Sequence, residues 1–169
     1  MLAATHSPVT TERPKAFDTI LIGGLIAGVL DGLDAVLFYN WSFQVPPALL
    51  FQHIASGLLG RQSFQLGWYT VALGVACHLT IALGAAAVFY AISLALPVLF
   101  RKPFVFGPAF GIAVYLVMHY GVVPLSAITK RTVPPTHLEL ADQLFTHMFF
   151  VGLPIALMAR KSARPRRPA

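Results

Sequence analysis

Residues 19 to 39 read TILIGGLIAGVLDGLDAVLFY, and this stretch decides the fold. An apolar run of this length can cross the hydrocarbon core of a bilayer as a single helix, which takes about 20 residues. The run nevertheless contains two acids, Asp31 and Asp34. A charged side chain at the centre of a membrane helix costs on the order of 3 kcal/mol even on the most lenient insertion scale. The two acids therefore predict polar partners on neighbouring helices, and hence a helix bundle.

Small residues repeat every four positions along the same run, at Gly24, Gly28 and Gly32. Because residues four apart share a helix face, this row forms a smooth strip on which another helix can pack closely. The sequence leaves two partners open for the strip. One is another helix of the same chain, and the other is a second copy of the protein in a homodimer.

The rest of the chain is similarly apolar. Hydrophobic residues make up 57% of the 169 residues and charged residues only 11%, whereas soluble domains carry about a quarter charged residues. The apolar runs predict four membrane spans, at about residues 18–39, 67–96, 104–124 and 138–159. We therefore expect an all-α membrane protein with one four-helix transmembrane domain over residues 18–159, between a cytoplasmic tail at 1–17 and a basic cytoplasmic tail at 160–169.

A shorter element is expected between the first two spans, at about residues 47–60. Its sequence, PALLFQHIASGLLG, is too short to cross the membrane. Leu50, Ile54 and Leu58 recur every four residues, while His53 and its polar neighbours share the other side. This pattern predicts an amphipathic helix that lies flat on the membrane surface or enters it as a re-entrant segment.

The basic residues predict how the chain is oriented. With both termini in the cytoplasm, the inner segments hold nine basic residues, and the outer loops hold three, at Arg61, Lys130 and Arg131. Cytoplasmic loops of membrane proteins carry such an excess of Lys and Arg. We expect a multi-pass protein of the bacterial inner membrane whose basic tail contacts anionic lipid. Nucleic-acid binding is not expected, because the tail is short and carries no aromatic residues.

Each predicted span contributes an ionisable residue at a similar depth, counted at about 1.5 Å per helical residue. The five candidates for a shared site are Asp31, Asp34, His78, His119 and His147. Ionisable groups inside membrane spans need partners, so we expect these side chains to form a polar pocket in the outer half of the bundle. Three further residues are expected around it: Tyr115 and Gln143 as hydrogen-bonding neighbours, and His53 as part of a lid.

Several functions are open for such a pocket. Asp–His contacts can simply hold the helices in register, in a protein that serves as a structural or interaction scaffold. The pocket can also bind or pass a small solute or a proton. Three histidines and a carboxylate suit a divalent metal such as zinc, iron or copper, and two histidines suit a haem. A membrane redox protein or hydrolase would then result, although no motif such as H-E-x-x-H supports it.

We expect a non-enzymatic membrane protein that handles a small solute or a proton and requires no cofactor. One cysteine, Cys77, lies in an apolar run, so disulfide chemistry within the chain is excluded.

Three stretches, GGLIAGVLDGLDAVLFY, IASGLLG and FVGLPIALMARK, resemble in this order small bacterial inner-membrane proteins of the YagU-like group. The resemblance covers most of the chain. It implies a multi-pass inner-membrane protein and supplies no catalytic or binding residue.

Overall fold

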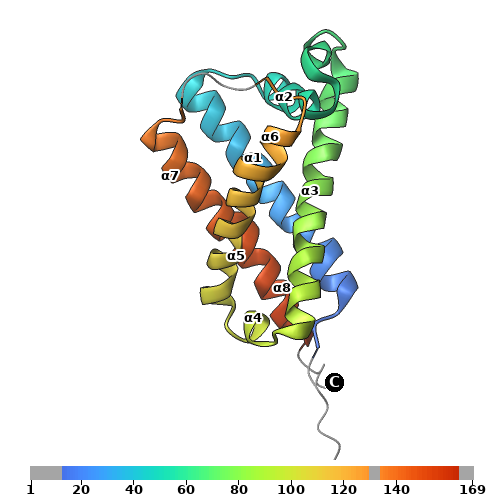
Figure 1. Cartoon of the computed structure of the whole chain (residues 1–169), viewed down its shortest axis with the longest axis vertical. Coiled ribbons are helices and arrows are strands. Elements are labelled where there is room, and N and C mark those ends of the chain that lie inside the picture. Colours follow the sequence, from blue (N-terminus) through green and yellow to red (C-terminus); the bar gives the residue numbers. More distant parts are fainter. Residues whose placement is uncertain (1–12, 130–133, 164–169) are drawn as a thin grey trace, which may run out of the picture.

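The computed structural model describes residues 13–129 and 134–163, which form helices and no strand. Four helical stretches are long and apolar enough to cross a membrane: Phe17–Phe43, Trp68–Ala95, Pro103–Leu125 and His137–Ala163. They run side by side, and an additional helix lies across one end of the bundle (Figure 1). The expected all-α membrane architecture of four spans and one extra helix is thus confirmed. The outer-loop residues Lys130 and Arg131, and the basic tail from Arg164 onwards, lie outside the described residues.

The first span consists of a π-helical segment, η1 (Phe17–Gly23), and α1 (Gly24–Phe43). Its glycine strip packs against the second span within the same chain. A Cβ atom on Gly28 would lie 3.0 Å from the Ala82 side chain, and one on Gly32 would lie 3.1 Å from the His78 ring. A homodimer through this strip would have to displace the second span, and that dimer stays a prediction.

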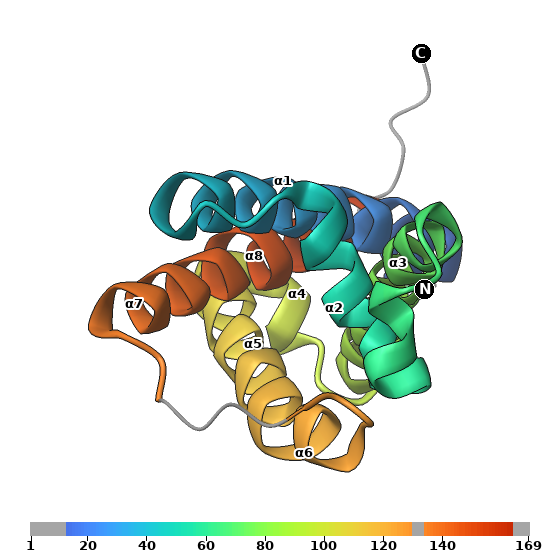
Figure 2. The same ribbon diagram turned by 90° about the horizontal axis from the view of Figure 1, so that it is seen from above.

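The extra helix, α2 (Pro47–Leu59), is followed by a 3₁₀ turn, η2 (Gly60–Phe64), and by the second span, α3 (Trp68–Ala95). Helix α2 packs directly on α3, because Gly74 leaves room for the backbone carbonyl of Phe51. Its far end is fixed as well, since the backbone N–H of Ala127 donates to the carbonyl of Gly57 over 2.9 Å. Helix α2 therefore bridges the second and third spans at one end of the bundle (Figure 2).

The third and fourth spans are each interrupted by a π-helical turn. The third comprises α5 (Pro103–Val117), η3 (Met118–Val122) and α6 (Val123–Leu125), and follows the short helix α4 (Val98–Arg101). The fourth comprises α7 (His137–Thr146), η4 (His147–Gly152) and α8 (Leu153–Ala163). Each π turn ends two residues before a proline, Pro124 or Pro154. Proline has no N–H to donate and its ring clashes with the carbonyl four residues earlier, so a wider turn is favoured there.

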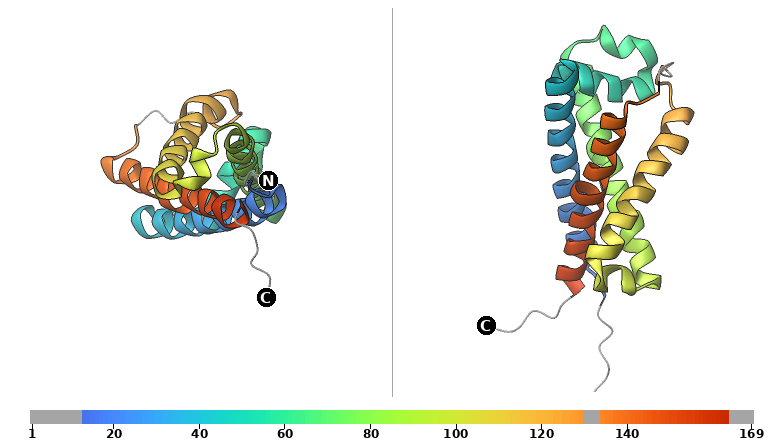
Figure 3. Two further views of the ribbon diagram at one scale, coloured as in Figure 1. Left: turned by 90° about the horizontal axis from the view of Figure 1, so that it is seen from below. Right: turned by 90° about the vertical axis from the view of Figure 1, so that its left-hand side faces the viewer.

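The helices converge at the end of the bundle where residues 13 and 163 lie, and the third span leans away from the others towards the α2 end (Figure 3). The converged half contains the apolar core, in which Phe89, Ile155 and Ala27 are fully buried. The candidate polar residues lie in the other half. This division separates the ionisable groups from the apolar core.

Helix α7 begins with a capping box. The Thr136 hydroxyl accepts a hydrogen bond from the backbone N–H of Glu139, and the Glu139 carboxylate accepts one from the backbone N–H of Thr136. We expect Thr136→Ala to lower the free energy of unfolding by about 1 kcal/mol, because the helix end loses an acceptor. Denaturation in detergent, followed by circular dichroism, measures this. Thr80→Ala is the matched control, since the exposed Thr80 hydroxyl only bonds a carbonyl of its own helix. Equal midpoints for both variants would contradict the prediction.

Candidate functional site

The first and fourth spans are joined by a ladder of polar contacts. Nearest the α2 end, the Gln143 side chain donates to the Tyr39 hydroxyl over 2.9 Å. One turn deeper, the Thr146 hydroxyl donates to the Asp34 carboxylate over 2.6 Å. The first and fourth spans are antiparallel. With increasing distance from the α2 end, the contacting residues therefore have lower numbers in the first span and higher numbers in the fourth. The next step brings Asp31 into electrostatic range of His147.

The second span contributes His78 from the opposite side of Asp31. The Nε2 atom of His78 lies 2.8 Å from the backbone oxygen of Gly28 and 3.8 Å from Oδ2 of Asp31. A carbonyl can only accept, so Nε2 carries the hydrogen and donates to Gly28. The distance to Asp31 is too long for a hydrogen bond but suits an ion pair when the imidazole is protonated. Both side chains are largely enclosed, at 15% exposed for His78 and 21% for Asp31.

The third span contributes a buried aromatic ring, Tyr115, which lies between two histidines. Its ring stacks on His119 with centroids 5.6 Å apart and meets His147 edge-on at 5.5 Å. The Nδ1 atom of His147 lies 2.8 Å from the backbone oxygen of Gln143 and therefore donates to it. In the neutral ring Nε2 is then left as an acceptor. The four spans thus supply one chain of groups: His119, Tyr115, His147, Asp31 and His78.

The structure brings four of the five candidate residues together, namely Asp31, Asp34, His78 and His147. The fifth, His119, reaches the cluster only through Tyr115, which lies next to His147 as expected of a neighbouring group. The side chain of Gln143 donates to Tyr39, while its backbone oxygen accepts from His147.

The expected lid residue, His53, is exposed, and its ring lies 6.5 Å from that of Phe64. The ring of α2 that faces the cluster belongs to Phe51, at 6.5 Å from the His78 ring.

Three polar residues of the site were not among the sequence-derived candidates: Tyr39, Asp142 and Thr146. Asp142 is half-buried and lies in electrostatic range of both Asp34 and Asp31. Thr146 precedes His147 directly and could have been found by pairing the first and fourth spans as antiparallel neighbours. Tyr39 ends the apolar run of the first span, where aromatic residues are common at membrane interfaces for other reasons. Its role in the ladder therefore had no distinctive signal.

A carboxylate with two imidazoles in electrostatic range can exchange protons, and a second and a third carboxyl group nearby, Asp34 and Asp142, add negative potential. A metal site needs several ligand side chains directed at one point. Within residues 13–129 and 134–163, no three His, Cys, Asp or Glu side chains lie close enough together to hold one metal ion. The metal and haem alternatives stay predictions from sequence.

These features define a multi-pass α-helical membrane protein whose four-helix bundle encloses a cluster of carboxylate and imidazole groups. No family model, no curated protein and no solved structure matches the chain. The resemblance to the YagU-like group stays an expectation.

Proposed function

We propose that this membrane protein binds and releases protons at the cluster around Asp31. The observation that carries the proposal is the approach of His78 Nε2 to within 3.8 Å of the Asp31 carboxylate, inside two helices that are candidate membrane spans. An ionisable pair at such a position lowers stability, because the membrane interior penalises charge. Ionisable residues inside membrane spans are therefore candidates for a functional role. A proton bound by the pair neutralises the carboxylate or charges the imidazole, and either change alters the forces between the first two spans.

The packing favours access from the α2 end only. Towards that end the cluster continues into the polar contacts of Asp34 and Gln143. Towards the other end it meets the apolar core, where Phe89 and Ile155 are fully buried. A proton therefore enters and leaves on one side, and transfer across the membrane requires the helices to rearrange. A small solute bound at the same cluster stays a prediction from sequence.

We further propose that the α2 end faces the periplasm of a bacterial inner membrane. Seven basic residues lie in the described part of the chain. Six of them belong to the segments at the terminus end: Arg13, Lys15, Arg101, Lys102, Arg160 and Lys161. Only Arg61 belongs to the α2 end. This asymmetry supports cytoplasmic termini.

The test is a pH titration of the protein in lipid nanodiscs, followed by infrared difference spectroscopy of the carboxylic-acid carbonyl band. We expect a protonation transition that disappears in Asp31→Asn and moves in pH in His78→Gln, because removing the imidazole changes the charge next to the carboxylate. Asp18→Asn is the matched control, since Asp18 belongs to the same span but lies near its terminus end. An unchanged carbonyl band in folded Asp31→Asn would overturn the proposal.

A further inference from the structure

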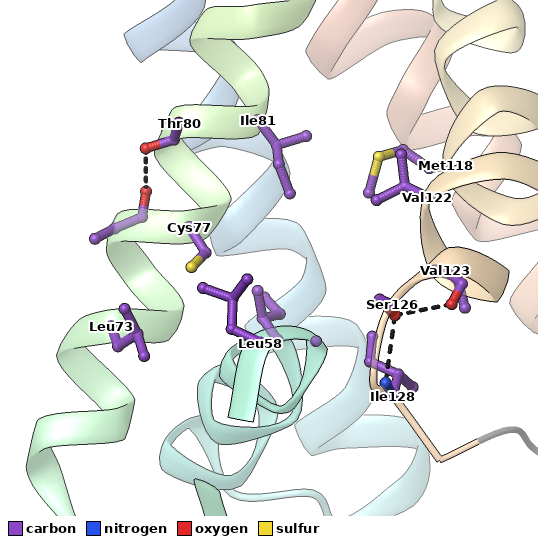
Figure 4. Close-up of a pocket in the computed structure, with 13 residues that line it drawn as sticks. Leu58, Leu73, Cys77, Thr80, Ile81, Met118, Val122, Val123, Ser126 and Ile128 are labelled. Atoms are coloured by element: carbon purple, nitrogen blue, oxygen red, sulfur yellow. Dashed lines mark hydrogen bonds between the residues drawn. The ribbon is translucent and has the colours of Figure 1, made fainter. Parts of the chain in front are cut away.

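A second site lies on the side of the bundle where the third span leans away. An open cavity of about 460 Å³ is lined by the end of α2, by α3 and by the segment η3–α6 (Figure 4). In the close-up, Cys77 and Ile81 of α3 face Met118 and Val122 across the space, and Leu58 of α2 closes one end. This volume falls in the range of cavities that hold small-molecule ligands.

The walls of the cavity are hydrocarbon. Its two hydroxyl groups are already bonded to the backbone of their own segments: Thr80 donates to the carbonyl of Ala76 over 2.7 Å, and Ser126 donates to the carbonyl of Val123 over 2.8 Å. A polar ligand entering here would lose its hydrogen bonds to water without replacing them, which disfavours it. The lining therefore selects a hydrocarbon chain.

The surroundings of the cavity indicate where that chain comes from. The two helical walls, α3 and the third span, are both candidate membrane spans. The cavity is open, because several of its lining side chains are exposed, among them Leu58 at 68% and Val122 at 41%. An open cavity between two membrane spans is accessible from the bilayer, which supplies acyl chains at high concentration. The exposed Arg61 lies in the turn η2 that follows α2, three residues after Leu58.

We propose that this cavity binds one acyl chain of an anionic phospholipid, whose phosphate group is held near Arg61. The apolar walls take the chain, and the guanidinium complements the headgroup charge at the membrane surface. The bound chain connects α2 to both neighbouring spans and so stabilises the helix that covers the proton-binding cluster. This inference does not depend on the proposed proton chemistry, because none of the cluster residues lines the cavity.

The test uses phosphatidylglycerol with a photoreactive diazirine in mid-chain, incorporated into phosphatidylcholine nanodiscs that contain the protein. Crosslinked peptides are mapped by mass spectrometry. We expect crosslinks to concentrate on the α3 and η3–α6 walls, and Ala76→Trp, which fills the cavity, to reduce them about fivefold, equivalent to about 1 kcal/mol of binding. Ala91→Trp is the matched control, because Ala91 is an exposed alanine of the same helix outside the cavity. Leu58→Trp fills the cavity from α2 and serves if Ala76→Trp does not fold.

Two comparisons complete the experiment. Arg61→Ala is expected to reduce crosslinking by phosphatidylglycerol and to leave that by a phosphatidylcholine probe unchanged. The thiol of Cys77, the one cysteine of the chain, gives an independent measurement. Adding phosphatidylglycerol back to delipidated protein should slow the alkylation of this thiol. The same addition should not slow it in Ala76→Trp, whose cavity is already filled. Crosslinks spread evenly over all lipid-facing helices, with equal yields in Ala76→Trp and Ala91→Trp, would overturn the proposal.

Discussion

Replacing Gly111 by leucine is expected to prevent the bundle from folding. Gly111 lies where α5 crosses the π turn η4, and a Cβ atom at this position would overlap the backbone carbonyl of His147. Backbone atoms cannot move aside as a flexible side chain can, so the third and fourth spans would have to separate. The crossing has no spare room elsewhere, because a Cβ on Gly152 would overlap the carbonyl of Gly107. We expect a loss of more than about 4 kcal/mol in the free energy of unfolding, at the upper end of single substitutions.

The measurement is unfolding by sodium dodecyl sulfate from a mild detergent, followed by circular dichroism and by gel filtration. Gly84→Leu is the control, since Gly84 lies in a membrane span too, but a Cβ there meets no atom within 4 Å. The control should unfold at the wild-type midpoint. A Gly111→Leu variant that elutes and unfolds like the control would show that α5 and η4 do not cross this closely.

The same crossing also bears on the candidate site. Tyr115 follows Gly111 by one helical turn and meets the ring of His147, whose own carbonyl occupies the space above Gly111. Gly111→Ala adds the same overlapping Cβ atom and should therefore also disturb the pairing of Tyr115 and His147.

The sequence was sufficient to predict the spans and the side of the first helix that faces the bundle. Both predictions need information from one helix only. The spans follow from the length of each apolar run, and the packing face follows from the four-residue spacing of Gly24, Gly28 and Gly32. The inward position of Asp31 follows from the same periodicity, because Asp31 continues a second row of small residues, Gly23 and Ala27, beside the glycines.

Pairing between helices could not be predicted in this way. Periodicity says which face of a helix is small or polar, but not which neighbour meets it or at what height. Gly111 and Gly152 were visible as small residues, yet nothing in the sequence indicated that they meet each other's helix. The π turns add a second obstacle, since each inserts an extra residue into a turn and rotates the faces that follow it. Thr146 was missed for the first reason, because a helix hydroxyl gives no distinctive signal until the neighbouring helix and its height are known.

Thr146→Val is expected to destabilise the protein by about 2 kcal/mol, because the Asp34 carboxylate then loses a charge-assisted hydrogen bond in a partly buried position. Thr146→Ser, which keeps the hydroxyl, should be close to wild type. Replacing both partners should cost less than the sum of the single changes, since Asp34→Leu removes the group that Thr146 satisfies. Unfolding in detergent measures all four proteins of this double-mutant cycle. Strictly additive effects would contradict a direct bond between the two side chains.

The cycle also separates the two acids of the first span. Asp34 accepts a short hydrogen bond of 2.6 Å from the uncharged hydroxyl of Thr146. This bond links the first span to the fourth. Asp31 has two imidazoles in electrostatic range instead, and His78 lies 3.8 Å from it. In the proposed function, this contact forms and breaks with the proton. Thr146→Val should therefore lower stability while leaving the expected protonation transition of Asp31 in place. If Thr146→Val abolished that transition in folded protein, the two acids would have to be treated as one titrating unit.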